Sequence, residues 1–416
     1  MSERIEVAGV SVSPDHYIDG QRVSSTRYFD LHSPIDQRLL GQVAEGLDAH
    51  VDQAVTAAEA AFPSWSGMAA TERKVVLDRF AAEIGKRADA FCQLESNDAG
   101  VLLSRMSHGV VPRSMLNITY FAEHALTLQD RPIDTEQAHH LVRHDPAGVT
   151  AIITPWNAPL MLGTWKLGPA LAAGNTVIIK PPEWAPLTMS LLADCADAAG
   201  LPAGVLNIVQ GYGATTGNRL VSDPRLARIS FTGSVPTAQK IAQAAGANLV
   251  PVSLELGGKS PFIVLEDADI DKAAATGALM YRNAGQVCLA GTRFLVHARI
   301  ADRFIAAMRG YAERLRVGDP REPETEVGPI IHPRQMERVG GFVDRAVAGG
   351  ARVLWGGRPH PFGAQYYSPT MLTDVGQDDA LVQNEVFGPV LTLQTFDSDD
   401  EAIAPDNATN DGMVGV

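Results

Sequence analysis

Cysteine is scarce in this 416-residue sequence, which contains only Cys92, Cys195 and Cys288. Because the three cysteines are far apart and form no CxxC pair, a disulfide framework and a cysteine-based zinc cluster are excluded, and a reducing compartment is favoured. The sequence also lacks any apolar run of 18 residues, and polar residues follow its first methionine. These absences predict no membrane span, no secretion signal and no bound metal, and we expect a cytoplasmic protein.

Positive charge is also in short supply. Lys and Arg total 34 against 48 Asp and Glu, the formal net charge is −14, and no long basic run is present. Nucleic acids and anionic membrane surfaces are therefore excluded as expected partners. With 45% apolar and 20% charged residues, the chain has enough material for large cores and is not disordered as a whole. Its length predicts two main lobes.

Before residue 149 the sequence predicts two helices and one polar segment. Apolar residues at spacings of three and four predict a helix over 47–62, with Asp48 placed to cap its first turn. A second helix is expected to begin at Thr71 as its N-cap. The segment 130–146 is polar, rich in His and bounded by prolines, so we expect it to leave the main body.

After residue 148 short β-rich runs alternate with helical runs, which predicts a parallel sheet covered by helices. The expected strands are 149–154, 176–180, 206–209 and 229–231, and the expected helices are 160–172, 187–199 and 235–245. A second α/β pattern predicts another lobe that begins near Gly257, with strands at 261–265, 292–296 and 390–396 and helices at 269–282 and 301–315. A last helix from Asp399 is expected to be interrupted by Pro405.

Two residues are candidates for covalent and acid–base chemistry. Cys288 lies in the small-residue loop NAGQVCLAG, which would let its thiol face a cleft, although a lone cysteine is also a common small core residue. Cys92 and Cys195 lie on amphipathic helices and are interpreted as core residues. Glu255 ends a strand before two glycines and could act as a base, or it could pair with a cation such as Lys259.

Three loops at expected strand ends are candidates for ligand binding. Asn157 in TPWN could donate a hydrogen bond to an oxyanion, or it could be an ordinary turn residue. Lys180 and Glu183 in KPPE offer a cation and a carboxylate to ribose hydroxyls, and FTGS at 231–234 offers backbone N–H groups to a pyrophosphate. The glycine run at 211–217 misses the GxGxxG spacing and is interpreted as a turn.

Six short motifs occur in order along the chain. They are TPWN at 154–157, KPPE at 180–183, FTGS at 231–234, LELGGKS at 254–260, GQVC at 285–288 and EVFGPV at 385–390. In content, order and spacing the set resembles the aldehyde dehydrogenase superfamily, over the chain up to about Phe396. The sequence around PPEWAP at 181–186 and GQVCLAGTR at 285–293 is most similar to that of the hydroxymuconic-semialdehyde dehydrogenase branch. This resemblance implies an α/β fold, with a Rossmann-type NAD-binding lobe and an α/β catalytic lobe.

The resemblance also implies a mechanism. Cys288 would attack the aldehyde carbon, and Asn157 with the Cys288 backbone N–H would hold the oxyanion of the thiohemiacetal. After hydride transfer to the nicotinamide, Glu255 would activate a water that hydrolyses the thioester. Trp165 would line the aldehyde tunnel, although an aromatic residue on a helix is more often core. Arg282 could meet a substrate carboxylate, although a solvated arginine at a helix C-terminus is the simpler interpretation.

The cofactor residues follow from the same resemblance. Lys180 and Glu183 would bind the adenosine ribose, and a carboxylate that repels a 2′-phosphate favours NAD over NADP. Glu385 and Phe387 would hold the nicotinamide ribose and ring. The remaining implied cofactor residues are Thr154, Pro155, Trp156, Gly213, Gly217, Phe231, Gly233, Ser234, Leu256 and Gly257.

The implied organisation has three parts. Residues 1–129 and 147–256 would form the NAD-binding domain, 130–146 a bridging segment for oligomer contacts, and 257–416 the catalytic domain. A homodimer or homotetramer is expected. The superfamily pattern continues beyond residue 416, so the chain is expected to be shortened at its C-terminal end. The alternative function is therefore a catalytically silent homologue that only binds nucleotide.

Overall fold

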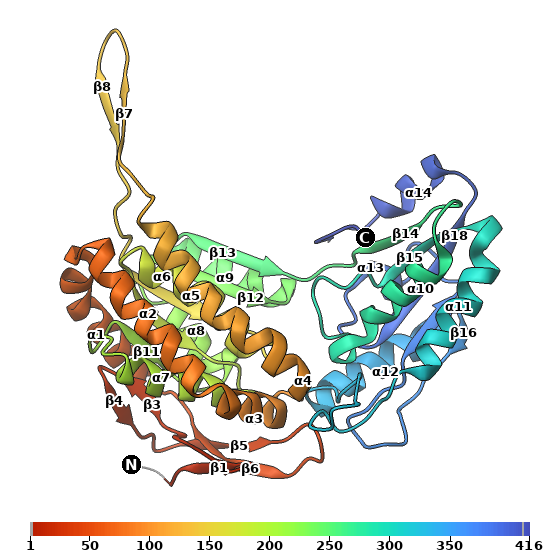
Figure 1. The fold of residues 1–416 in the computed structure, drawn as a ribbon, viewed down its shortest axis with the longest axis horizontal. Coiled ribbons are helices and arrows are strands. Elements are labelled where there is room, and N and C mark those ends of the chain that lie inside the picture. Colours follow the sequence, from red (N-terminus) through yellow and green to blue (C-terminus); the bar gives the residue numbers. More distant parts are fainter. Residues whose placement is uncertain (1–2, 410–411) are drawn as a thin grey trace. The chain divides into compact units, whose positions relative to one another are not determined.

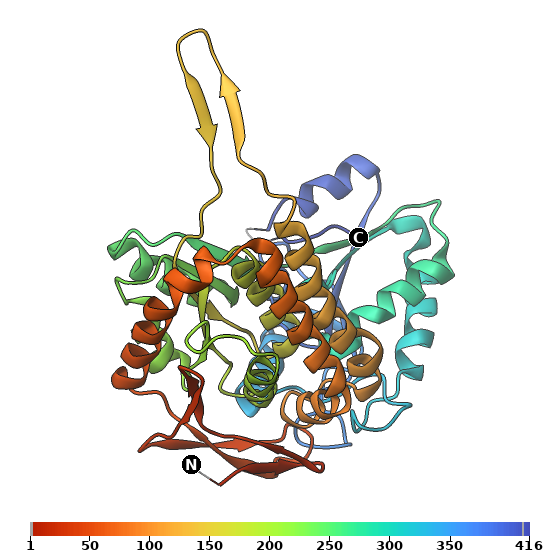
Figure 2. The ribbon, with the colours of Figure 1, turned by 60° about the vertical axis from the view of Figure 1, so that its left-hand side comes forward.

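The computed structural model describes residues 3–409 and 412–416, which form two compact units (Figures 1 and 2). The first unit contains residues up to 32, 39–99 and 105–255, and the second contains 33–38, 100–104 and 256–416. No helix in the described part of the chain is long and apolar enough to cross a membrane.

A seven-stranded sheet forms the centre of the first unit. Its strand order is β13 (Val252–Leu256), β12 (Arg228–Gly233), β9 (Val149–Ile153), β10 (Thr176–Lys180), β11 (Leu206–Ile208), β3 (His16–Ile18) and β4 (Gln21–Val23). Strands β12, β9, β10 and β11 are parallel, whereas β3 and β4 join as an antiparallel edge. The predicted parallel sheet is thus confirmed, and the antiparallel edge comes from N-terminal strands that the sequence did not reveal.

The order of the strands creates a reversal point next to β9. The chain runs from β9 through α6 (Pro159–Ala172) to β10 and through α7 (Leu187–Ala198) to β11, and then returns to place β12 on the other side of β9. Strands β9 and β10 are completely buried and rich in Val, Ile and Thr, as expected for strands covered on both faces. Open α/β sheets bind ligands outside the carboxyl ends of their strands at such a reversal.

Helices and small β-ribbons complete the first unit. The helices are α1 (Asp48–Gly67), α2 (Ala70–Lys86), α3 (Ala88–Asp98), α5 (Val111–Ala125), α8 (Asn218–Val221) and α9 (Val235–Ala247), with π-helical turns at Met106–Val110 and Gly213–Gly217. The short helix α4 (Leu103–Arg105) belongs mostly to the second unit, which includes residues 100–104. Two antiparallel ribbons are formed by β1 (Ile5–Val7) with β2 (Val10–Val12) and by β5 (Tyr28–His32) with β6 (Leu39–Ala44).

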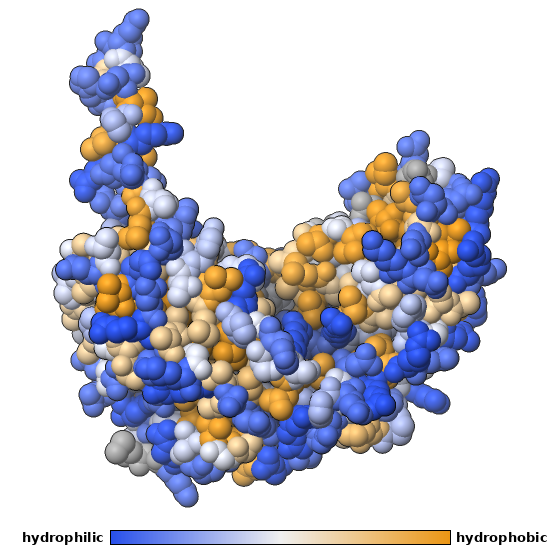
Figure 3. All heavy atoms as spheres, viewed as in Figure 1, coloured by the Kyte–Doolittle hydropathy of each residue, from blue (hydrophilic) through white to orange (hydrophobic). Residues whose placement is uncertain are grey.

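The segment 130–146 contains an exposed antiparallel hairpin, which extends away from the body of the first unit (Figures 1 and 2). Its strands are β7 (Arg131–Asp134) and β8 (His139–Val142), and every residue of both strands is exposed. Apolar Ile133, Leu141 and Val142 are exposed among polar neighbours (Figure 3). The hairpin therefore leaves apolar side chains uncovered.

The second unit is built on a five-stranded sheet. Its order is β14 (Pro261–Val264), β15 (Arg293–His297), β18 (Val390–Phe396), β17 (Thr370–Thr373) and β16 (Arg352–Trp355), of which the first four are parallel and β16 is antiparallel. Its helices are α10 (Ile270–Ala278), α11 (Ala301–Arg314), α12 (Pro333–Ala348), α13 (Ala380–Gln383) and α14 (Asp399–Asp406), with 3₁₀ turns at Leu279–Gly285 and Ala298–Ile300. The core includes a stack of Phe262 on Phe294, whose ring centres are 4.6 Å apart.

Three local predictions were wrong at helix ends. Thr71 is not an N-cap, because α2 begins one residue earlier and the Glu72 carboxylate accepts a hydrogen bond from the Ala69 N–H at 3.1 Å. Asp48 is the first helical residue of α1 and does not cap it, since the His50 ring accepts from the Leu47 N–H instead. Pro405 lies in the last turn of α14 and does not interrupt that helix.

Candidate active site

Cys288 follows a backbone segment with an uncommon conformation. Asn283, Ala284 and Gly285 all have positive φ angles of 54°, 53° and 68°. A side chain at Gly285 would collide with the carbonyl of Gly388, so the glycine allows the two loops to touch. Left-handed backbone at non-glycine residues is costly and concentrates at functional sites.

Gln286 ties the same loop to its surroundings. Its side-chain amide donates to the Asn283 carbonyl at 2.9 Å and to the Pro329 carbonyl at 3.3 Å, and its side-chain oxygen accepts from the Ile331 N–H at 3.0 Å. Because Gln286 is itself buried, these hydrogen bonds are shielded from water. The loop is therefore held in place on the N-terminal side of Cys288.

The three thiols differ in accessibility. Cys288 is partly exposed, whereas Cys92 and Cys195 are buried. Burial raises the pKa of Cys92 to about 11 and that of Cys195 to about 12. Since the thiolate is the nucleophile, two of the three cysteines are chemically silent and Cys288 is the accessible thiol.

Iodoacetamide at pH 8 is expected to alkylate Cys288 in the folded protein and to leave Cys92 and Cys195 unmodified. Thiols with pKa values of about 11 and about 12 are thiolate to roughly one part in a thousand or less at that pH. Peptide mass spectrometry of native and urea-unfolded protein measures the labelling, and the unfolded sample should carry label at all three positions. Labelling of Cys92 or Cys195 as fast as Cys288 in the native protein would contradict this interpretation.

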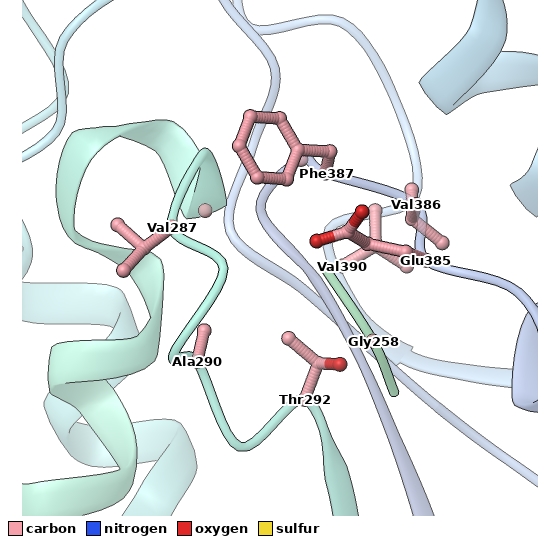
Figure 4. A pocket seen from close by; sticks show the side chains of 10 residues that line it. Gly258, Val287, Ala290, Thr292, Glu385, Val386, Phe387 and Val390 are labelled. Carbon is pink, nitrogen blue, oxygen red and sulfur yellow. The ribbon is translucent and has the colours of Figure 1, made fainter. Parts of the chain in front are cut away.

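A pocket in the second unit lies beside the cysteine loop. Figure 4 shows Glu385 and Phe387 across it from Val287 and Ala290. A side chain at Gly257 would collide with the Glu385 carboxylate, so this glycine makes room for the acid. The lining residues are Gly258, Gly285, Val287, Ala290, Thr292, Glu385, Val386, Phe387, Gly388 and Val390.

Side chains of α12 hold the segment that contains Glu385 and Phe387 through hydrogen bonds to its backbone carbonyls. Gln335 donates to the carbonyls of Val386 at 3.1 Å and Phe387 at 2.8 Å. Arg338 donates to the Glu385 carbonyl at 2.6 Å. These contacts hold the backbone while leaving the Phe387 side chain to line the pocket.

Lys259 belongs to the same region and is almost completely buried. Its ammonium group has no hydrogen-bond partner among the described residues. Burial lowers its pKa to about 7, and the charge of Glu385 acts in the opposite direction. Lys259 therefore has an electrostatic neighbour in Glu385, which no local sequence pattern indicates.

In the first unit the TPWN and KPPE loops leave adjacent strands. Residues Ile153 of β9 and Lys180 of β10 are directly paired in the parallel register, and the Thr154 N–H donates to the Lys180 carbonyl at 3.3 Å. The rings of Trp156 and Trp184 lie 6.0 Å apart, so the two loops also meet through their side chains. Asn157 is buried near this junction.

Lys180 and Glu183 form an ion pair of 3.0 Å in which the lysine is buried. Burial is the largest single influence on Glu183 and acts to raise its pKa. The positive charge of Lys180, together with hydrogen bonds from Lys180 and from the backbone at Glu183 and Gly213, holds that pKa below its ordinary value. A side chain at Gly217 would press on the Lys180 stem, and Gly213 also lies close to the lysine. The glycine run interpreted as a simple turn thus packs against the ion pair.

The FTGS loop leads from β12 into α9 at the other side of the reversal point. The Phe231 ring lies against Gly233, where a side chain would collide with it. Ser234 is the N-cap of α9, and its hydroxyl lies 3.1 Å from that of Thr237. The loop therefore presents the N-terminus of a helix of 13 residues, where backbone N–H groups favour an anion.

Glu255 and Lys166 are electrostatic neighbours. Glu255 is exposed near the end of β13 and does not lie in an apolar setting. Lys166 donates to the Ser230 hydroxyl at 3.1 Å, and burial lowers its pKa to about 8 although the charge of Glu255 acts in the opposite direction. Sequence reasoning missed Lys166, although it directly follows Trp165.

The two candidate substrate residues are both exposed. Trp165 is 43% exposed, so the core interpretation was wrong for this side chain, and the Arg113 guanidinium stacks on its ring at 5.0 Å. Arg282 is exposed, and its backbone is extended within the segment Leu279–Gly285, which is not helical from Arg282 to Ala284. Both side chains are available for contact with a ligand.

A profile of the aldehyde dehydrogenase family matches residues 21–416. The chain belongs to the aldehyde dehydrogenase family. A Staphylococcus aureus protein described as an aldehyde dehydrogenase is 38% identical over 405 residues, which are 96% of this chain and 85% of that protein.

Solved structures of aldehyde dehydrogenases give the same picture. One from Burkholderia cenocepacia is 42% identical, with a TM-score of 0.92 over 96% of this chain and 83% of that one. The indole-3-acetaldehyde dehydrogenase AldA of P. syringae, a cysteine-to-alanine mutant in complex with NAD+ and IAA, is 37% identical with a TM-score of 0.93, again over 96% and 83%. The fold predicted from the six motifs is therefore confirmed.

The candidate residues of this aldehyde dehydrogenase fall into two groups. Asn157, Lys180, Glu183 and Glu255 belong to the first unit, and Cys288, Glu385 and Phe387 belong to the second. Within each unit the structure brings the motifs together at loops between strands and helices. Each group is thus assembled from segments that are distant in sequence.

Proposed function

We propose that this chain oxidises an aldehyde to the carboxylic acid with NAD as the electron acceptor, through a covalent intermediate on Cys288. The observation that carries the proposal is the single accessible thiol, placed after a strained loop and beside a pocket that Glu385 and Phe387 line. Family membership and the NAD+ complex of the P. syringae relative support the same reaction.

The residues present fit NAD. Glu183 and Lys180 offer a carboxylate and a cation for the adenosine ribose, and a carboxylate there favours NAD over NADP. The Thr154 hydroxyl is buried without a hydrogen-bond partner among the described residues, which suits a loop that binds a ligand. We infer that Gly233 and Ser234 at the N-terminus of α9 would bind the pyrophosphate, and that Glu385 and Phe387 would hold the nicotinamide half.

The proposed mechanism uses three residues of the chain. The Cys288 thiolate attacks the carbonyl carbon, while the Asn157 amide and the Cys288 backbone N–H donate to the oxyanion that forms. Hydride then leaves the carbon, which converts the thiohemiacetal into a thioester; NAD supplies the acceptor for this hydride when it is bound. Glu255 removes a proton from a water molecule, and the water oxygen attacks the thioester carbonyl. The carboxylic acid is released, and the sulfur of Cys288 leaves and is free for the next cycle.

We assign cofactor binding to residues 1–129 and 147–256 and covalent catalysis to residues 257–416. We further propose a homodimer or homotetramer whose contacts involve the 130–146 hairpin, since Ile133, Leu141 and Val142 are exposed on it. A cytoplasmic location is proposed because all three cysteines are free. Trp165 and Arg282 are proposed to meet the aldehyde, Trp165 through its exposed ring.

NADH formation followed at 340 nm tests this function. The purified chain is expected to reduce NAD with at least one member of a panel that contains indole-3-acetaldehyde, an aromatic-degradation semialdehyde and a short aliphatic aldehyde, and to prefer NAD over NADP. A chain that binds NAD but forms no NADH with any of them would contradict the proposal and would favour the role of a nucleotide-binding protein without turnover.

A further inference from the structure

The C-terminal half of α3 carries two acidic residues in an unusual setting. Glu95 and Asp98 are completely buried and lie three residues apart, so they are neighbours on one face of the helix. Neither forms a salt bridge with a lysine or arginine among the described residues, although the charge of Arg105 acts on Glu95. Buried acids normally require a specific partner, because removing a carboxylate from water is costly.

The partners of the two carboxylates are helix N-termini. One oxygen of Glu95 accepts from the Leu160 N–H in the first turn of α6 at 3.0 Å. One oxygen of Asp98 accepts from the Leu187 N–H at the start of α7 at 2.9 Å. The cap positions of α6 and α7 are Ala158 and Pro186, which have no polar side chain to do this.

Each of these helices begins directly after a proposed cofactor loop. Helix α6 follows the TPWN loop that contains Asn157, and α7 follows the KPPE loop that contains Lys180 and Glu183. A shift in the first turn of either helix would displace the preceding loop. The two acids on α3 are therefore placed to set the positions of both loops from one rigid element.

We propose that Glu95 and Asp98 are positioning residues, Glu95 for the oxyanion-binding loop through α6 and Asp98 for the adenosine-ribose loop through α7. The inference rests on the proposed function and assigns it two supporting residues. It predicts a separation of effects: Glu95 governs kcat, because Asn157 acts on the reacting oxygen, whereas Asp98 governs the affinity for NAD.

The protonation of the two acids indicates the conservative substitutions. Burial raises the pKa of Glu95 to about 7, although the hydrogen bond from Leu160, the side chain of Thr188 in α7 and the charge of Arg105 act in the opposite direction. Burial also raises the pKa of Asp98 well above its usual range, and the charge of Glu95 adds to this effect. A neutral amide that keeps one acceptor oxygen is thus a close substitute at each position, in the variants E95Q and D98N.

The test compares these amides with apolar residues that fill the site but cannot accept a hydrogen bond, E95M and D98L, with the alanine variants as a second pair. Hydrogen exchange is measured by mass spectrometry without cofactor or substrate. E95M is expected to speed exchange on the order of tenfold chiefly in peptides over 154–163, because Glu95 accepts from the Leu160 N–H, and D98L chiefly in peptides over 181–190. E95Q and D98N should exchange like the wild type.

Kinetics and NAD titration by tryptophan fluorescence supply the functional readout. E95M is expected to lower kcat about tenfold with the Kd for NAD within about threefold, and D98L to raise that Kd about tenfold with kcat preserved at saturating NAD. D89A, at an exposed acid on the same helix, is the matched control and should change neither.

Faster exchange throughout the first unit in both apolar variants, or equal losses of kcat and NAD affinity in both, would overturn the proposal in favour of general stabilisation. Exchange unchanged in the paired loop would also overturn it. Because exchange needs no turnover, an inactive wild-type chain would count against the proposed function and leave the exchange result decisive for the positioning role.

Discussion

Replacement of Cys288 by alanine is expected to lower NADH formation at least about a thousandfold and to leave the Kd for NAD within about threefold. The thiolate forms the bond to the aldehyde carbon, and no other thiol in the chain is accessible to replace it. The measurement is steady-state turnover at 340 nm together with NAD titration by tryptophan fluorescence.

The control for this variant is Cys195→Ala, which removes a buried thiol of α7 and should keep turnover within about threefold. Turnover retained in C288A would show that Cys288 is not the nucleophile. A parallel loss of NAD affinity would mean instead that the substitution had damaged the cofactor site.

Replacement of Glu255 by glutamine is expected to separate thioester formation from its hydrolysis. The variant should release close to one equivalent of NADH per site in a rapid burst, after which turnover falls at least about a hundredfold, because the amide cannot take a proton from water. Stopped-flow absorbance at 340 nm measures the burst and the steady rate in one experiment.

The matched control is E313Q, at an exposed glutamate of α11, which should behave as the wild type. Normal steady turnover in E255Q would remove Glu255 from the hydrolytic role. Loss of the burst together with the steady rate would place Glu255 in the first chemical stage and contradict its assignment to the second.

Most sheet strands from residue 149 onwards could be predicted, because strands that are buried on both faces are short continuous runs of apolar and β-branched residues. β16 and β17 of the second sheet were not predicted. β9 and β10 are short runs of Val, Ile and Thr between helical patterns, and both lie close to their expected bounds. The N-terminal strands β3 and β4 are three residues each. β3 pairs with β11, which lies almost two hundred positions away, and β4 joins the sheet only through β3. No local pattern could reveal them.

In the candidate site, too, features encoded in consecutive residues could be predicted, and features that depend on tertiary contacts could not. The motifs around Cys288 and Glu385 could be recognised because each consists of consecutive residues in one loop. The positions of Lys166 beside Glu255 and of Glu95 beneath α6 depend on tertiary contacts between separate helices and strands. Single acids or lysines on helices carry no signal of this kind, since the same residue types usually face solvent.

The central claim is that oxidation proceeds through a thioester on Cys288, and acid-quenched peptide mass spectrometry of the E255Q variant tests it most directly. With NAD and a turned-over aldehyde, the peptide that contains Cys288 should gain the mass of the aldehyde less two hydrogen atoms, and C288A/E255Q should gain nothing. No adduct, an adduct that forms equally without NAD, or an adduct at another residue would contradict the account.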